Sequence, residues 1–517
     1  MRFRSLIRWL PVLLILALTS CDSAPLPVLG EEVPISDVID GAITVERNPS
    51  GRVPLSAQFD LATVEPVRIS WTVLGDEPLE YSQTWFSRTH SVPVLGLYPD
   101  TTNQVQVRLD LINGDWALDT LHVATRALPE HFPDVEVTVM GGPREPGWFQ
   151  SHVSFGLGGR YGTTPLAYDE NGVIRWYLEL TDLGGMAFML EQLANGNFIT
   201  GFREDIFEYD AMGNEVNTWH MPGNLYHHDV HEKPDGNLIV AVDVEAWSTI
   251  EDAAIELDRA TGAIVNSWDL RPVLDVDRRT LTGSDTDWFH MNSVWFDPRD
   301  NGVIFSGRNQ GVVKVTYDNE LVWILSPHAG WEGTNARGQN LQDFLLTAVD
   351  GSGTPYADAV QQGHDRAPDF DWSWGQHAAM TTDAPGRLLL FDNGFNRQFG
   401  LNDFYSRAVE YDIDESAMTI RQVWQYGRER GRETYSAIIS DVDVLPETGN
   451  RLYMPGIIFD PPNHAWVTEV TYPSGNTVME AKLTLKNQFG SGAFAWGEFD
   501  LVYRSDKVNL PDLLPAR

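Results

Sequence analysis

Residues 234–239, Pro-Asp-Gly-Asn-Leu-Ile, and residues 262–268, Gly-Ala-Ile-Val-Asn-Ser-Trp, decide the fold. The first segment places an Asp-Gly turn before an apolar strand, and the second places a Gly turn before a strand that ends in Trp. This pattern recurs at intervals of about 50 residues, with one interval of about twice that length. The closing residues are Trp176, Trp219, Trp268, Trp323 and Trp424.

Each repeat predicts a small sheet that cannot bury both of its faces alone. Such sheets become stable when they close around a common axis. The polar segment 332–371, rich in Gly and Asp, explains the long interval as an insertion, and a final unit at about 445–485 lacks the Trp. We therefore predict an all-β protein in which residues 133–510 form a six-bladed β-propeller.

Residues 35–127 have a different pattern, with alternating strands and closely spaced turns. Segment 95–101, Leu-Gly-Leu-Tyr-Pro-Asp-Thr, resembles a fibronectin type III domain, although Asn103 and Gln104 stand where the corner Tyr is expected. These features predict a small fibronectin III/Ig-like β-sandwich ahead of the propeller. Residues 22–34 are rich in Pro and predict a tether.

The first 21 residues have the pattern of an export signal, with a basic start and a short apolar run. The run ends in Leu-Thr-Ser-Cys, which resembles a bacterial lipobox with Cys21 as the lipidated residue. A plain secretory signal with an incidental Cys is the alternative. Asp22 resembles a signal for retention in the inner membrane. We expect an extracytoplasmic, periplasmic lipoprotein that touches a bacterial membrane only through its lipid.

Composition excludes several classes of function. Lys and Arg number 36 against 73 Asp and Glu, a formal net charge of −37, and such a surface repels nucleic acid. The chain has a single cysteine, so no intramolecular disulfide can form. Aromatic residues make up 11% of the chain and 44 residues are Gly, a mixture typical of short strands and tight turns.

Histidines recur at the start of three of the predicted units. Segments 226–231 (Tyr-His-His-Asp-Val-His), 288–293 (Trp-Phe-His-Met-Asn-Ser) and 374–380 (Trp-Gly-Gln-His-Ala-Ala-Met) each precede a turn and an apolar strand. Equivalent positions of a closed ring face one another across its axis. We therefore expect several imidazoles to point into one cavity.

Three interpretations of these histidines are open. A metal site is one, since His227, His228 and His231 have ligand-like spacing, but alternate residues of a strand face opposite sides, which separates His228 from the other two. Buried hydrogen bonding between blades is the second. The third is an oxyanion site that includes the amide of Asn292 and the guanidinium of Arg308, although Arg308 could instead form an inter-blade salt bridge.

Taken together, these segments resemble the bacterial arylsulfate sulfotransferases that need no nucleotide sulfate donor. The resemblance rests on the three His segments and on residues 306–310 (Ser-Gly-Arg-Asn-Gln), 323–331 (Trp-Ile-Leu-Ser-Pro-His-Ala-Gly-Trp) and 389–394 (Leu-Leu-Phe-Asp-Asn-Gly). It implies that His377 is a nucleophile that carries a sulfuryl group. It also implies that the sulfate is bound by His228, His290, Asn292, Arg308 and Ser440.

The resemblance leaves His227 and His228 as alternatives, because only a count back from the following turn separates them. It implies transfer of a sulfuryl group from a phenolic sulfate ester to a phenol by a ping-pong mechanism, with no metal or other cofactor. Small phenols and aryl sulfates are the implied partners, together with a homodimer through the N-terminal domain. The alternative function is a non-catalytic extracytoplasmic propeller that binds an anion, a glycan or a protein.

Overall fold

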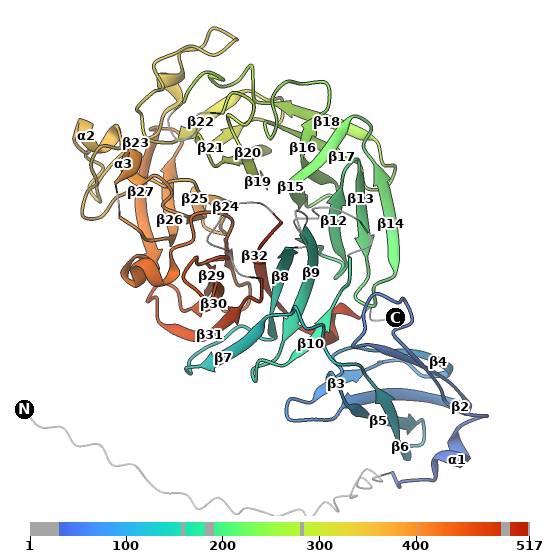
Figure 1. Cartoon of the computed structure of the whole chain (residues 1–517). Coiled ribbons are helices and arrows are strands. Elements are labelled where there is room, and N and C mark those ends of the chain that lie inside the picture. The colour runs from blue at the N-terminus through green and yellow to red at the C-terminus, as the bar shows by residue number, and fades with distance from the viewer. Residues whose placement is uncertain are drawn as a thin grey trace, which may run out of the picture.

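The computed structural model describes residues 30–156, 161–180, 183, 191–279, 284–401, 403–487 and 497–514. In this part of the chain most regular elements are strands, which form a small N-terminal domain and a ring of sheets beside it (Figure 1). The predicted signal peptide, Cys21 and most of the predicted tether lie outside the described residues. No helix among the described residues has the length and apolar character that crossing a membrane requires.

The N-terminal domain consists of one helical turn and six strands. They are α1 (Ile35–Val38), β1 (Thr44–Arg47), β2 (Ala57–Val73), β3 (Leu79–Ser82), β4 (Ser87–Val94), β5 (Thr102–Leu111) and β6 (Trp116–Ala124). The first half of β2 pairs with β1 and β4, whereas its second half pairs with β3 and β5. This change of partners folds the strands over a core that includes Phe59, Trp71 and Val107.

Within the described residues, six sheets of four or five strands follow one another around the ring, as the blades of a propeller do (Figure 1). The first three contain β8 (Trp148–Gly156), β9 (Tyr161–Tyr168) and β10 (Ile174–Tyr177) with β32 (Leu501–Val508); β11 (Glu191–Gln192), β12 (Phe198–Phe202), β13 (Asp205–Tyr209) and β14 (Glu215–His220); and β15 (Asn224–Glu232), β16 (Leu238–Val244), β17 (Ala253–Leu257) and β18 (Ile264–Asp269).

The other three sheets complete the circle. They contain β19 (Met291–Asp297), β20 (Gly302–Gly307), β21 (Gly311–Val315) and β22 (Leu321–Leu325); β23 (Thr347–Ala348), β24 (His377–Thr381), β25 (Arg387–Asp392), β26 (Arg407–Asp414) and β27 (Thr419–Tyr426); and β28 (Asp441–Val444), β29 (Arg451–Met454), β30 (His464–Val470) and β31 (Thr477–Thr484) with β7 (Asp134–Val139). Short helical turns lie at η2 (Leu341–Phe344), α2 (Asp358–Gln361), α3 (Arg397–Gly400), η3 (Arg428–Thr434) and η4 (Leu510–Leu513).

Two strand pairings close the ring, and each joins a strand from the start of the ring domain to a strand from its end. β32, near the end of the chain, pairs with β8 on the inner side of the first sheet, and β7 pairs with β31 on the outer side of the last. The inner strands β15, β19, β24, β28 and β32 contact one another in that order, and Figure 1 shows β15, β19, β24 and β32 around the axis. The site therefore draws on strands that are distant in sequence.

Most of the repeated Trp residues link one sheet to the next by a hydrogen bond from the indole N–H. The indole N–H groups of Trp176, Trp219 and Trp424 donate to carbonyl oxygens at 2.9–3.0 Å, each in the turn before the last strand of the following sheet. Trp323 donates to a Glu415 carboxylate in the equivalent turn. The contact thus repeats at four of the five recurring Trp residues, whereas the buried indole N–H of Trp268 has no hydrogen-bond partner among the described residues.

The segment predicted as an insertion, 332–371, lies within one sheet. It carries η2, β23 and α2, and β23 adds to β27 in parallel. The long interval between Trp323 and Trp424 therefore contains one sheet with an insertion rather than two sheets.

The buried Arg175 of β10 fixes the N-terminal domain to the ring. Its guanidinium donates to the carbonyl of Gly96 at 2.7 Å, pairs with Asp169 at 3.0 Å and lies 3.4 Å from the ring centre of Tyr98. Asn103, which stands where a corner Tyr was expected, accepts from the Tyr98 N–H at 2.7 Å and donates to the Tyr98 carbonyl at 2.9 Å. An amide thus holds this corner in place of a phenol.

Candidate active site

Bulges in three inner strands bring the predicted histidines together. β15, β19 and β24 each lose their regular register beside a histidine. At the bulges His228, His290 and Ala378 have φ values of 58°, 59° and 52°, a conformation that is costly for residues other than Gly and common at functional sites. The ring centres of His228 and His290 lie 5.2 Å apart, and the pKa of His377, which burial holds well below its usual range, is lowered further by the charges of Arg308 and His290.

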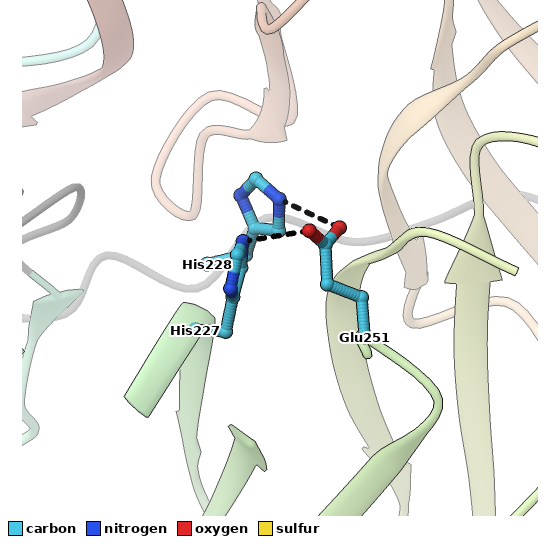
Figure 2. A group of neighbouring side chains, drawn as sticks. All are labelled: His227, His228 and Glu251. Carbon is cyan, nitrogen blue, oxygen red and sulfur yellow. Dashed lines mark hydrogen bonds and ion pairs between the residues drawn. The ribbon is translucent and has the colours of Figure 1, made fainter. Parts of the chain in front are cut away.

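Glu251, in the loop between β16 and β17, gathers three of the imidazoles. Its carboxylate oxygens lie 3.1 Å from Nε2 of His227, 3.2 Å from Nε2 of His228 and 2.8 Å from Nδ1 of His290. Figure 2 shows the carboxylate facing both neighbouring imidazoles. The expectation that His227 and His228 face opposite sides is therefore wrong, because the bulge in β15 lets both rings reach one acceptor.

Asp229 and His231 point elsewhere, along the ring axis. Asp229 accepts from the N–H of Val294 at 2.7 Å and pairs with Arg504 at 3.3 Å, and the ring of His231 lies 4.3 Å from that of Trp295. All five residues line a cavity of about 50 Å³ between the inner strands. This cavity is called the axial channel below.

Two groups among the described residues have donor atoms close enough to share a metal ion: His227 with His228 and Glu251, and Glu251 with Asp287 and His290. In both groups the carboxylate contacts the imidazole nitrogens directly. The same donor atoms therefore form ion pairs and hydrogen bonds with one another.

These ion pairs divide the imidazoles into charged and neutral rings. Burial alone would lower the pKa of His290, but Glu251 and Asp287 outweigh it and raise the pKa to about 9. Glu251 likewise outweighs burial at His227, whose pKa is raised. Burial and the charge of His227 lower the pKa of His228 to about 3. Despite its own burial, Glu251 keeps a pKa well below the usual range because imidazolium rings surround it.

His377, the first residue of β24, is buried and held in one tautomer. Its Nδ1 lies 2.8 Å from Oδ1 of Asn393. The Asn393 amide nitrogen donates to the carbonyls of Ser436 and Ile439, so its oxygen must accept, and Nδ1 of His377 must carry the hydrogen. Burial, with help from the charge of Arg308, holds the pKa of His377 well below its usual range. Nε2 therefore keeps its lone pair.

Arg308 follows β20, and its backbone N–H donates to the carbonyl of His290 at 2.9 Å. Its guanidinium carbon lies 4.3 Å from the ring centre of Phe395. Among the described residues it has no ion-pair partner, and its buried Nε makes no hydrogen bond. Burial lowers the pKa of Arg308, but a guanidinium stays charged at neutral pH. Asp287 and Glu251 act on Arg308 through their charge but are not in ion-pair contact with it, so the described residues do not contain the inter-blade salt bridge, and an oxyanion could contact the guanidinium directly.

Asn292 and Ser440 form hydrogen bonds with protein groups near His377. The buried amide of Asn292 donates to the carbonyl of Gln376 at 2.7 Å, and its oxygen has no partner among the described residues. The Ser440 hydroxyl donates to that of Ser436 at 2.9 Å and accepts from the N–H of Gly456 at 3.0 Å. A direct contact of either residue with sulfate stays a prediction.

Sequence reasoning missed three residues of the site. Glu251 lies in a loop without periodic pattern, and Tyr503, whose hydroxyl lies 2.6 Å from Nδ1 of His228, comes from β32 at the other end of the chain. Asn393 had a signal, since it lies in the segment 389–394 that carries the family resemblance. Its role was not predicted because Asn393 acts only by orienting the imidazole of His377, a contact that the sequence does not reveal.

Fold and site together define a β-sheet ring with imidazoles and an unpaired guanidinium at its axis. The profile of the family described as Arylsulfotransferase (ASST) matches residues 120–492, and that of the Arylsulfotransferase Ig-like domain matches residues 44–126. The chain belongs to the arylsulfotransferase family, a family of transferases, as its sequence motifs predict.

Two relatives carry the description arylsulfate sulfotransferase AssT. The protein from Escherichia coli O6:H1 is 27% identical over 505 residues, covering 78% of this chain and 82% of the relative. The protein from Lelliottia amnigena is 27% identical over 504 residues, with the same coverage. Among solved structures, the periplasmic gluconolactonase PpgL of Pseudomonas aeruginosa is similar with a TM-score of 0.35 and 12% identity, over 66% of this chain and 96% of that one. That similarity is too low to bear on function.

Proposed function

We propose that this chain transfers a sulfuryl group from a phenolic sulfate ester to a phenol, through a sulfohistidine at His377 on a six-bladed β-propeller. The family supplies the class of reaction. The environment of His377 carries the mechanism: a neutral imidazole with its Nδ1–H held by Asn393 and a lone pair on Nε2.

The first half-reaction follows from the charges of the site. Nε2 of His377 attacks sulfur, the bond between sulfur and the phenolic oxygen breaks, and the phenolate leaves with the bonding electrons. The imidazolium of His290 gives its proton to the phenolate, which is a suitable task for a group with a pKa of about 9. Arg308 offsets the negative charge of the sulfuryl oxygens.

The second half-reaction reverses these steps with another phenol. The acceptor gives its proton to His290, its oxygen attacks sulfur, and the N–S bond breaks with its electrons returning to Nε2 of His377. The proton that left His290 in the first half is restored in the second. A full cycle therefore needs no proton exchange with solvent and no cofactor.

The test is turnover of a chromogenic aryl sulfate with a phenol acceptor. Wild-type protein should release the donor phenol with parallel double-reciprocal lines, and His377→Asn should lose about 10⁴-fold or more of kcat while keeping its unfolding temperature. His364→Asn, at an exposed histidine, is the matched control and should turn over normally. Intersecting lines or an active His377→Asn protein would contradict the mechanism. Absence of turnover with every pair would favour a non-catalytic binding function.

We also propose that a lipid on Cys21 anchors the protein to a bacterial membrane outside the cytoplasm. The lipobox-like segment that ends at Cys21 supports this proposal. Cell fractionation should find the wild-type protein with membranes and the Cys21→Ser protein in the soluble fraction. A Cys21→Ser protein that stays with the membranes would show that the anchor lies elsewhere.

A further inference from the structure

We infer that Glu251 is a positioning residue for the proposed sulfuryl transfer, a shared counter-ion that keeps His290 protonated for the leaving phenol and aligns the rings of His227 and His228 beside it. The inference rests on the proposed function and deepens it. No sequence motif pointed to Glu251, and its role follows from its contacts.

The backbone of Glu251 is fixed before its side chain acts. Its φ is 57°, in the left-handed region, and its N–H donates to a carboxylate oxygen of Asp243 at 2.6 Å. Its carbonyl accepts from the N–H of Met291 at 2.8 Å, directly after His290. Glu251 therefore has a strained backbone that hydrogen bonds to β16 and β19 hold in place. Backbone strain of this kind costs free energy and is found mainly at functional sites.

The carboxylate then meets three imidazoles while only 6% of its side chain is exposed. In such a setting its charge acts through a low dielectric and strongly favours protonated partners. Asp287 also contacts Nδ1 of His290, at 2.9 Å, but 28% of its side chain is exposed, so solvent screens it more. Glu251 is therefore the stronger determinant of the charge on His290.

Other charged groups act on the cluster in both directions, because the acids favour protonated imidazoles whereas the charges of His227 and His290 oppose each other. Asp243 pairs with Nδ1 of His227 at 3.2 Å and does not contact His290. Arg308 favours the ionised form of Glu251. Burial raises the pKa of the Tyr503 phenol, which bonds to His228 as a neutral group. The groups facing the cluster are thus Asp243, Asp287, Arg308, Tyr503 and His377.

The expected effect of Glu251→Gln concerns the pH at which His290 loses its proton. A raised pKa means that His290 is charged below that value and neutral above it, so activity that needs the imidazolium falls as the pH rises through it. Removing the counter-ion should move this basic limb of the kcat/KM profile to lower pH by about one to three pH units. A donor with a poor leaving group should suffer most, because it depends most on protonation.

The experiment compares Glu251→Gln, Glu251→Asp and the matched control Asp287→Asn, using 4-nitrophenyl sulfate and phenyl sulfate as donors. We expect the largest shift of the basic limb in Glu251→Gln, a smaller one in Asp287→Asn and recovery in Glu251→Asp. At the pH between the old and new limbs, Glu251→Gln should lose about tenfold more activity with phenyl sulfate than with 4-nitrophenyl sulfate. An equal loss at every pH and with both donors would mean a merely structural role and overturn the inference.

A second measurement does not depend on turnover. In protein labelled at histidine, NMR should follow the titration of His290, identified by the signal that disappears in His290→Gln. We expect that titration to move to lower pH in Glu251→Gln, and an unchanged titration would overturn the counter-ion role. A stoichiometric metal bound by wild-type protein and lost in Glu251→Gln would overturn it too. A wild-type protein without turnover would overturn the proposed function, while this titration still decides the role of Glu251.

Discussion

Two neighbouring regions on the same inner strands have opposite arrangements of charge. At the candidate site, Arg308 is a cation with no ion-pair partner among the described residues. In the axial channel, Arg504 pairs with Asp229 at 3.3 Å and with Glu191 at 3.6 Å, and further acids line the same cavity. These acids are Asp441, Asp443 and Asp506.

The difference shows where an anion can reside. An excess of carboxyl groups makes the axial channel hostile to sulfate, and burial raises the pKa of several of them, that of Asp506 to about 7. At the candidate site the nearby acids Glu251 and Asp287 contact His290 and form no ion pair with the Arg308 guanidinium. In a chain with a net charge of −37, one cation without an ion-pair partner is the feature that the proposed binding of an anionic ester would need.

Replacement of the two arginines should separate the regions most clearly. Arg308→Ala should lower kcat/KM by about 10²–10³-fold, because a preorganised positive group at the sulfuryl oxygens is removed, while the unfolding temperature changes little. Arg308→Lys should keep part of the activity, since the charge remains but the planar donor set is lost. Kinetics and thermal unfolding on the same samples give both readouts.

Arg504→Ala is the matched variant in the axial channel. It should cost about 3 kcal/mol of stability at pH 8, because it leaves buried carboxylates without a cation, and less at pH 5, where they can take up protons. If Arg504→Ala instead weakens sulfate recognition without loss of stability, or Arg308→Ala unfolds the protein, the division between the two regions fails.

A smaller effect is expected from Asp506→Asn. The raised pKa of Asp506 means that the folded state binds its proton more tightly than the unfolded state, so its contribution to stability is complete below about pH 4 and is lost as the pH rises through about 7. Asp506→Asn should therefore stabilise the protein by roughly 2 kcal/mol at pH 8 and have almost no effect at pH 4. Denaturant unfolding at both values, with the exposed Asp40→Asn as control, measures this. A pH-independent difference would contradict the assignment.

The repetitive part of the architecture was predictable from sequence because it repeats. Four of the five recurring Trp residues donate a hydrogen bond to the following sheet, and the histidine segments recur since each lies at an inner strand. The family and its Ig-like domain, inferred from motifs such as 306–310 and 374–380, are confirmed by the comparisons. Segment 332–371 is an insertion because it precedes β24 in the chain, and β24 to β27 then form one sheet to whose edge β23 adds.

What could not be predicted depends on irregular backbone and distant pairing. The sides taken by His227 and His228 follow from a bulge with a left-handed His228, a conformation that a simple strand pattern does not contain. Glu251 reaches the site from a loop whose path is set by tertiary contacts. The pairing of β32 with β8 joins residues from opposite ends of the ring, which local patterns do not encode.

That last pairing has a consequence for when the protein can first work. β32 supplies Tyr503 to His228 and Arg504 to the acids of the axial channel, and it comes from residues 501–508. A nascent chain that still lacks these residues contains His377, the proposed nucleophile, but neither the closed ring nor the complete surroundings of its imidazoles. The proposed sulfuryl transfer would therefore have to wait until β32 has been synthesised and has paired with β8.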